Sequence, residues 1–463
     1  MALRYEWRSY ICLGAVKMDK RKEQGVFFNF DNTSPAAPLV IRNGRVIDPL
    51  NGVDRVSHLV CDEGKIWGIV DEIPERFNQV EVVEAEGKWV VPGLVDMHVH
   101  LREPGREDKE TIATGTRAAA AGGFTAVACM PNTQPSLDEE SKIRYVIQRG
   151  ENCPCRIYPI GAITKGLDGE ELAPIGEMVH AGARAVSDDG KSVARTNIMR
   201  NALNYSKSFN IPVICHCEDP AISQKGHMNE GVYSTRLGIR GIPTIAEEII
   251  VSRDLLLAEY TGARVHIAHV STAGSVRLVR DAKSRGVNVT AETCPHYVAL
   301  IDEDVGMYDT NKKMNPPLRT AHDRKAVIEG CVDGTIDVVA SDHAPHVSEE
   351  KNVEFDAAAF GVIGLETSLG VINTRLVKKG ILSPMQMVER MSVMPNRILG
   401  LGGGTFSRGA IADITIIDPS ARWIVDARMF HSKSRNTAFE GAELHGRAVR
   451  TIIGGHTVYV AGE

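Results

Sequence analysis

The stretch Val95-Asp-Met-His-Val-His-Leu-Arg-Glu-Pro104 decides the fold of this chain. It opens on an apolar run short enough for a buried strand, and two histidines follow at positions i and i+2. Side chains two residues apart on a strand point to the same side, so His98 and His100 can hold one metal ion between them. Arg102 follows at the mouth of the same strand. Isolated His-x-His pairs are common, so the prediction of a metal site depends on what later strands carry.

The bulk composition is that of a globular protein. At 463 residues the chain can form one barrel-sized domain and a smaller one. Its apolar fraction of 43% and charged fraction of 24% argue against disorder, and no apolar run approaches the roughly 20 residues of a membrane span. A formal charge of -6 gives no reason to expect a nucleic-acid partner. Nine cysteines without paired CxxC spacings argue against a disulfide framework and favour a reducing cytoplasm.

Both ends of the chain carry short strand-like segments. Alternating apolar residues divided by turns such as Asn43-Gly44 fill residues 38–92, and a similar pattern returns in residues 405–463. Because each end supplies only a few strands, we predict one small β-sandwich domain built from both termini. Charged residues interrupt residues 1–37, which excludes a secretory signal. We expect a flexible N-terminal extension there, or a start site placed too early.

Residues 93–404 show a different pattern, in which strand-like runs recur at intervals of roughly 30 residues. Helical segments separate most of these runs; residues 110–121, for example, end at the stop signal Gly122-Gly123. Eight such units predict an α/β fold with a parallel (β/α)8 TIM-like barrel rather than an open sheet. The expected strands are 94–101, 125–130, 156–163, 183–187, 212–217, 264–270, 288–293 and 336–341.

Polar residues recur at the carboxyl ends of these expected strands, where such barrels carry their active sites. Each has an ordinary explanation by itself: Asp188-Asp189-Gly190 is a turn signature, and His216 and His269 could be satisfied core histidines. Their joint position on one rim favours a common site. The candidates are His98, His100, Arg102, Asn132, Asp188, Asp189, His216, His269, Asp342 and His346.

Imidazoles and carboxylates are ligands that suit zinc, and cysteine is not required. Four histidines and two aspartates exceed the needs of one tetrahedral ion, so a pair of divalent ions with a shared carboxylate is expected. Two metals can hold a hydroxide at neutral pH, because coordination lowers the pKa of water to about 7. The class of reaction predicted is metal-assisted attack on a carbonyl or phosphoryl centre. Arg102 and Asn132 favour a substrate with a carboxylate.

Four motifs resemble those of dihydroorotases, in the amidohydrolase superfamily. They are His98-Val-His-Leu-Arg-Glu-Pro-Gly105, Met130-Pro-Asn-Thr133, Asn315-Pro-Pro-Leu-Arg319 and Ser341-Asp-His-Ala-Pro-His346. The likeness runs from about Pro38 to the C-terminus, and Lys433-Ser-Arg-Asn-Thr437 extends it beyond the barrel.

The resemblance implies one or two zinc ions, with two favoured, and a carboxylate from strand four between them. Many superfamily members use a carboxylated lysine there, but this chain has no lysine at that strand end and resembles the branch that uses aspartate. Asp189 is chosen for its spacing to His216, and Asp188 is the alternative. The implied metal ligands are His98, His100 and Asp342 for one ion, and His216 and His269 for the other. The implied substrate contacts are His100, Leu101, Arg102, Asn132, Asn315, His346, Phe360 and Gly361.

The implied reaction is the reversible cyclisation of N-carbamoyl-L-aspartate to L-dihydroorotate and water, in de novo pyrimidine (UMP) synthesis, with Asp342 as the catalytic proton carrier. Two alternatives stay open. A hydantoinase, dihydropyrimidinase or allantoinase would share the barrel, but the missing lysine and Leu101-Arg102 count against it. A non-catalytic or partner-dependent homologue would assemble with aspartate transcarbamoylase, but none of the matched positions is eroded. A homo-oligomer stays open as well.

Overall fold

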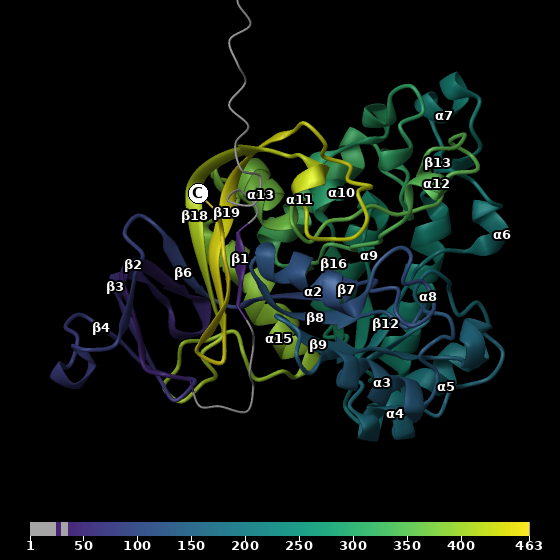
Figure 1. Cartoon of the computed structure of the whole chain (residues 1–463). Coiled ribbons are helices and arrows are strands. Elements are labelled where there is room, and N and C mark those ends of the chain that lie inside the picture. Colours follow the sequence, from purple (N-terminus) through teal and green to yellow (C-terminus); the bar gives the residue numbers. More distant parts are fainter. Residues whose placement is uncertain (1–24, 29–35, 463) are drawn as a thin grey trace, which may run out of the picture.

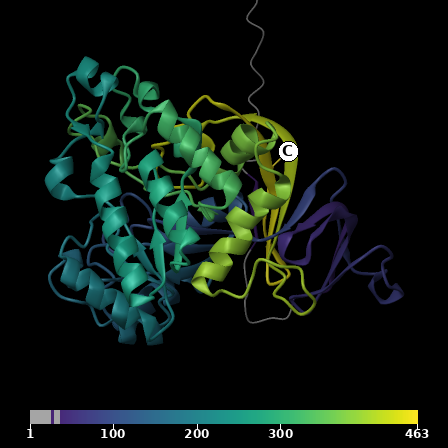
Figure 2. The same cartoon turned by 180° about the vertical axis from the view of Figure 1, so that it is seen from behind.

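The computed structural model describes residues 25–28 and 36–462. A large α/β barrel lies beside a smaller β domain that holds both the first and the last strands of the described chain (Figure 1). Seen from behind, helices cover the face of the barrel that is turned toward the viewer (Figure 2). Within the described ranges, no helix is both long and apolar enough to cross a membrane.

The barrel strands are parallel neighbours in chain order, in the runs β7-β8-β9 and β10-β11-β12-β15-β16-β17. A parallel bridge between Val99 and His343 joins the first strand to the segment that follows the last one and closes the ring. The predicted (β/α)8 barrel is thereby confirmed. The strands are β7 (Leu94–Val99), β8 (Phe124–Cys129), β9 (Arg156–Pro159), β10 (Gly161–Ala162), β11 (Val186–Ser187), β12 (Val213–Cys215), β15 (Val265–Ile267), β16 (Val289–Thr293) and β17 (Val338–Val339).

The third expected strand, 156–163, is divided into β9 and β10. Ile160 donates its N–H to the carbonyl of Cys129, on β8, and Gly161 donates to the carbonyl of Ala185, just before β11. The chain therefore changes its pairing partner between these two residues. One run of strand-like sequence serves both neighbours, and the division leaves the order of the barrel unchanged.

Helices surround the barrel. The first, α2 (Ile112–Ala121), begins later than expected because Thr111 forms a capping box with Thr114. The other α-helices are α3 (Glu140–Gly150), α4 (Ile175–Ala181), α5 (Thr196–Lys207), α6 (Pro220–Ser223), α7 (Val232–Leu237), α8 (Ile245–Thr261), α9 (Ala273–Ser284), α10 (Pro295–Ala299), α11 (Ala321–Asp333), α12 (Ser348–Lys351), α13 (Ser368–Ile372), α14 (Pro384–Val388) and α15 (Met394–Leu399). A short parallel pair, β13 (Met228–Asn229) and β14 (Gly241–Ile242), lies between α6 and α8.

A separate apolar cluster fills the middle of the barrel. Most barrel strands contribute a small or aliphatic side chain to it, and strands on opposite sides of a closed barrel can meet only at its centre. Ile398 and Leu399 of α15 complete this cluster. Its members on the strands or directly next to them are Met97, Ala128, Met130, Ile160, Ala185, Ile214, Ala268, Val338 and Ala340. The barrel is therefore a packed core, and polar chemistry is left to the rim.

The small domain is a sheet in the order β1-β20-β19-β18-β6-β2-β3-β4, with β5 paired to β2. It encloses its own core, which includes Leu39, Leu59 and Ile414, and it is the predicted β-sandwich from both termini. Its strands are β1 (Val26–Phe27), β2 (Leu39–Asp48), β3 (Val53–Asp62), β4 (Lys65–Val70), β5 (Glu81–Glu84), β6 (Trp89–Pro92), β18 (Ile414–Ile424), β19 (Glu443–Ile453) and β20 (His456–Val460).

The expected N-terminal extension, residues 1–37, is only partly described. Within it, β1 pairs antiparallel with β20 in the register Val26 to Val460. Residues 1–24 and 29–35 lie outside the described residues, so the expected flexibility of this segment stays a prediction.

Candidate metal centre and active site

Asp189 lies at the centre of four imidazoles at the carboxyl end of the barrel. Its Oδ1 is 3.3 Å from His98 Nε2, 3.5 Å from His269 Nε2 and 3.7 Å from His216 Nδ1. Its Oδ2 is 3.4 Å from His100 Nε2. All five side chains are buried. Four histidines from three separate regions of the sequence thus meet around one carboxylate.

Asp342 joins this group from the loop after β17. Its Oδ1 is 3.1 Å from His100 Nε2 and 3.6 Å from His98 Nε2. Asp342 and His269 both have a positive φ, of 47° and 35°, a backbone region that non-glycine residues rarely adopt. Such backbone costs of order 1–3 kcal/mol and persists where the surroundings determine it. The two residues are held in place by the fold.

Asp188 faces away from the histidines. Its Oδ1 accepts hydrogen bonds from the backbone N–H groups of Ile163 and Thr164, at 2.8 and 3.0 Å. Its Oδ2 accepts a further bond from the Thr164 hydroxyl. Asp188 therefore ties the fourth strand to the third, and of the two adjacent carboxylates Asp189 is the one among the imidazoles.

The donors at this centre fit a divalent metal ion. Ligand atoms of His98, Asp189 and His269 lie within 4.8 Å of one another, as do those of His98, His100 and Asp342. His98 Nε2 and Asp189 Oδ1 are buried and make no hydrogen bond within the described residues. Unsatisfied buried polar atoms are costly, and a metal ion would satisfy both.

The electrostatics of the centre favour positive charge. Burial opposes a proton on His98, yet the carboxylates of Asp189, Glu292 and Asp342 outweigh burial and raise the pKa of His98 well above its usual range. Burial also raises the pKa of a carboxyl, but the charge of His98 outweighs it and lowers the pKa of Asp189 well below its usual range. The same carboxylates would also attract a divalent cation.

Sequence reasoning missed Glu292, a wholly buried residue on β16. Its Oε1 lies 2.5 Å from His98 Nδ1, and its Oε2 lies 3.2 Å from His266 Nε2. A carboxylate that accepts from Nδ1 fixes the imidazole so that Nε2 is free for a metal. The available signal was a charged residue inside a run that reads as a buried strand.

Arg102 and His346 lie together beside the metal centre. The Arg102 Nε donates to the carbonyl of Pro345 at 3.2 Å, and its guanidinium is 3.4 Å from His346 Nε2. His346 Nε2 lies 2.8 Å from the carbonyl oxygen of Phe360 and donates to it, and Lys109 Nζ is 3.2 Å from His346 Nδ1. Burial and the neighbouring Arg102 lower the pKa of His346 to about 3, so its imidazole is neutral at neutral pH.

The loop after α12 reaches the same place through Phe360 and Gly361. Gly361 has a φ of 128°, and a Cβ there would lie 2.7 Å from the Cβ of Ala344. Asn436, from the small domain, donates to the carbonyl oxygens of both Ala344 and Gly361, at 3.1 Å each. The small domain therefore helps to position the loops around His346.

The two predicted asparagines line the rim at separate points. Asn132 Oδ1 is 2.8 Å from His100 Nδ1. Asn315 Nδ2 donates to Glu218 Oε2 at 2.5 Å, and that oxygen is 3.6 Å from His216 Nε2. The structure thus brings both amides to the metal centre. Leu101 differs, because its side chain packs in the apolar core, and only its backbone can face a ligand.

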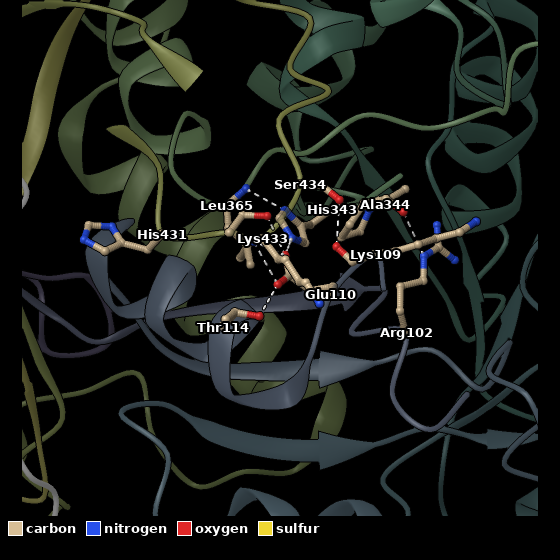
Figure 3. A network of polar contacts seen from close by, with 12 residues as sticks. Arg102, Lys109, Glu110, Thr114, His343, Ala344, Leu365, His431, Lys433 and Ser434 are labelled. Atoms are coloured by element: carbon tan, nitrogen blue, oxygen red, sulfur yellow. Dashed lines mark hydrogen bonds and ion pairs between the residues drawn. The ribbon is translucent and has the colours of Figure 1, made fainter. Parts of the chain in front are cut away.

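A second buried network ties the small domain to this rim (Figure 3). The carboxylate of Glu110 accepts hydrogen bonds from His343 Nε2 at 3.3 Å and from the backbone N–H of Lys433 at 3.0 Å. The hydroxyls of Ser432 and Thr114 donate to it as well. Burial raises the pKa of a carboxyl, but the hydrogen bond from His343 leads the contacts that lower the pKa of Glu110 overall.

Replacing Glu110 with alanine is expected to lower the free energy of unfolding by about 2–4 kcal/mol, because several buried donors lose their acceptor. Urea unfolding followed by fluorescence measures it. Glu107→Ala is the matched control: Glu107 is exposed, accepts one bond from Gly105 N, and should change stability by less than about 0.5 kcal/mol. Equal losses in both variants would contradict the role given to this network.

The fold and the site together define a metal-dependent amidohydrolase. The chain has a closed (β/α)8 barrel, a β-sandwich from both termini, and a rim that carries four histidines and two aspartates. A family described as dihydro-orotase-like matches residues 87–275. The dihydroorotase of Pelobacter propionicus is 54% identical over 425 residues, which cover 91% of this chain and 99% of that protein. The dihydroorotase of Pelotomaculum thermopropionicum is 54% identical over 420 residues, which cover 91% of this chain and 98% of that protein. The chain belongs to the dihydroorotase family, and it is a hydrolase that acts on cyclic amides.

Solved structures share the fold at lower identity. The L-hydantoinase (dihydropyrimidinase) of Arthrobacter aurescens superposes with a TM-score of 0.82 at 25% identity, over 92% of this chain and 96% of that one. The dihydropyrimidinase of Brevibacillus agri superposes with a TM-score of 0.79 at 22% identity, over 92% of this chain and 97% of that one. Barrel and sandwich are therefore common to several cyclic amidohydrolases, and discrimination between substrates must come from the rim.

Proposed function

We propose that the chain is a dihydroorotase, which interconverts L-dihydroorotate and N-carbamoyl-L-aspartate in de novo pyrimidine synthesis. One observation carries the choice of substrate. Arg102 lies beside the metal centre and forms no ion pair with a carboxylate among the residues that the structure describes. Burial lowers the pKa of Arg102 to about 10, so the guanidinium is still charged at neutral pH. A charged, unpaired guanidinium at this place fits the carboxylate that dihydroorotate carries and hydantoin lacks.

The metal centre would hold two zinc ions. His98, His100 and Asp342 would bind one of them, and His216 and His269 the other, with Asp189 shared between the two. This nitrogen and oxygen donor set suits zinc. When bound, such ions polarise a carbonyl and lower the pKa of water to about 7.

Asp342 would carry the proton. In ring opening, the oxygen of water bonds to the ring carbonyl carbon and the bond from that carbon to the ring nitrogen breaks. Asp342 takes a proton from the attacking water and delivers it to the leaving nitrogen; in cyclisation it removes that proton and protonates the departing oxygen. Burial raises the pKa of a carboxyl, but the charge of His98 outweighs it and lowers the pKa of Asp342, so Asp342 starts as a base.

The remaining rim residues would orient the substrate. Arg102 would bind its carboxylate with two parallel hydrogen bonds. The amides of Asn132 and Asn315 would bind the polar ring edge; in support, Asn132 contacts His100 and Asn315 contacts Glu218, beside His216. His346 and the backbone of Leu101, Phe360 and Gly361 would complete the pocket, as would His100.

The Arg102→Met variant should raise KM for L-dihydroorotate by about 10-fold to 100-fold, which corresponds to about 1.5–3 kcal/mol for one charged hydrogen-bonded contact. Steady-state kinetics measure the change. The matched control is Arg106→Met, because Arg106 already pairs with Asp108 and Glu350, each at 2.8 Å. A KM that stays at the wild-type value in Arg102→Met would exclude Arg102 as the carboxylate ligand.

A turnover panel tests the substrate itself. The purified chain should open L-dihydroorotate at least about 10²-fold faster than hydantoin, dihydrouracil or allantoin, because only dihydroorotate uses Arg102. A hydantoinase would show the opposite order.

A further inference from the structure

Cys294 and His296, which the proposed reaction does not use, form a cluster with its proton carrier, Asp342. They follow β16 with Pro295 between them and are fully buried, at 0% and 2% exposure. The Cys294 sulfur, a ring nitrogen of His296 and a carboxylate oxygen of Asp342 lie within 4.8 Å of one another. Three potential ligands of three chemical types therefore converge beside the metal centre.

A second observation indicates that something binds there. His296 Nε2 is buried and has no hydrogen-bond partner among the described residues. Native structures rarely leave a buried nitrogen unsatisfied, and the cost is about 1–3 kcal/mol. The ring is held by edge contact with Tyr297, at 4.2 Å between centroids.

We propose that Cys294, His296 and Asp342 form a third metal site, which accepts thiophilic divalent ions such as zinc and cadmium and whose occupation inhibits the enzyme. Binding releases the thiol proton to solvent, and the resulting thiolate and the carboxylate together balance the charge of the dication. Inhibition follows because the ion engages the carboxylate that accepts the proton, and in this respect the inference rests on the proposed function. The six ligands proposed for the main centre include no sulfur, so only this site should prefer thiophilic ions.

Cys217 supplies a matched control. It is also buried at the carboxyl end of a barrel strand and follows the imidazole of His216 directly. Its sulfur lies 3.6 Å from the carbonyl oxygen of Cys215 and 3.9 Å from Asp254, and it is not part of a ligand cluster within the described chain.

Cobalt titration tests the site without depending on activity. The metal-free chain takes up Co2+ in increasing equivalents while near-ultraviolet absorbance is recorded, because a thiolate bound to Co2+ gives a charge-transfer band there. Wild type and Cys217→Ser should show the band only after the second equivalent, and Cys294→Ser should not show it. Absence of the band in wild type, or its persistence in Cys294→Ser, would overturn the proposal. His296→Gln should weaken the third binding step by about tenfold or more and serves if the serine variant does not fold.

Zinc inhibition tests the consequence. Enzyme loaded with two equivalents of zinc should lose activity as free zinc rises, and Cys294→Ser should require at least about tenfold more zinc for half inhibition. Cys217→Ser should behave like wild type. Equal inhibition of Cys294→Ser and wild type would refute the inhibitory role. If the two-zinc enzyme is inactive in wild type, the proposed function fails, and the cobalt band still decides whether the third site exists.

Discussion

Asp342→Asn is expected to lower kcat for L-dihydroorotate by about 10³-fold or more, because an amide cannot accept the proton that passes between water and the ring nitrogen. Asparagine keeps the shape of the side chain and one oxygen, so much of the metal should remain. Rates are compared at equal metal content, in both directions of the reaction.

The control for this variant lies at the other end of the same strand. Asp337 precedes β17 and pairs with Lys283 at 2.6 Å, far from the carboxyl rim. Asp337→Asn should leave kcat within about twofold at full occupancy. If Asp342→Asn kept kcat within tenfold of wild type while carrying its metal, another residue would have to move the proton.

Replacing Asp189 with asparagine is expected to weaken metal binding by about 10²-fold or more, because four imidazoles lose the negative charge at their centre. Metal analysis after dialysis against a graded zinc buffer measures the affinity.

Asp188 is the matched comparison, since it is the adjacent residue and equally buried. Asp188→Asn should keep its metal and instead lose about 1–3 kcal/mol of stability, because its carboxylate accepts bonds from Ile163 and Thr164. Metal loss in Asp188→Asn with retention in Asp189→Asn would reverse the assignment.

The barrel could be predicted because strand periodicity and stop signals recur locally. Each expected strand overlaps a strand of the structure, and the histidines fell at strand ends, where a barrel must bring them together. What could not be predicted depends on contacts between distant residues. The division of 156–163 follows from a change of pairing partner, and the start of α2 follows from a cap at Thr111.

The choice between Asp188 and Asp189 shows the same limit. Adjacent residues on a turn point in different directions, and only the surroundings show which one faces the imidazoles. Glu292 and His296 were missed for a related reason. Glu292 acts on His98, which is 194 residues away in the sequence. His296 has a ring nitrogen that finds no hydrogen-bond partner among the described residues. By contrast, Arg102 was found early, because it follows His100 by two residues in the sequence.

The most direct test of the central claim is ring opening of L-dihydroorotate by the purified chain, with the metal content of the same sample determined. The account predicts turnover with about two zinc equivalents per chain, and loss of turnover in Asp342→Asn. No turnover by a fully metallated sample, even after addition of aspartate transcarbamoylase, would contradict it.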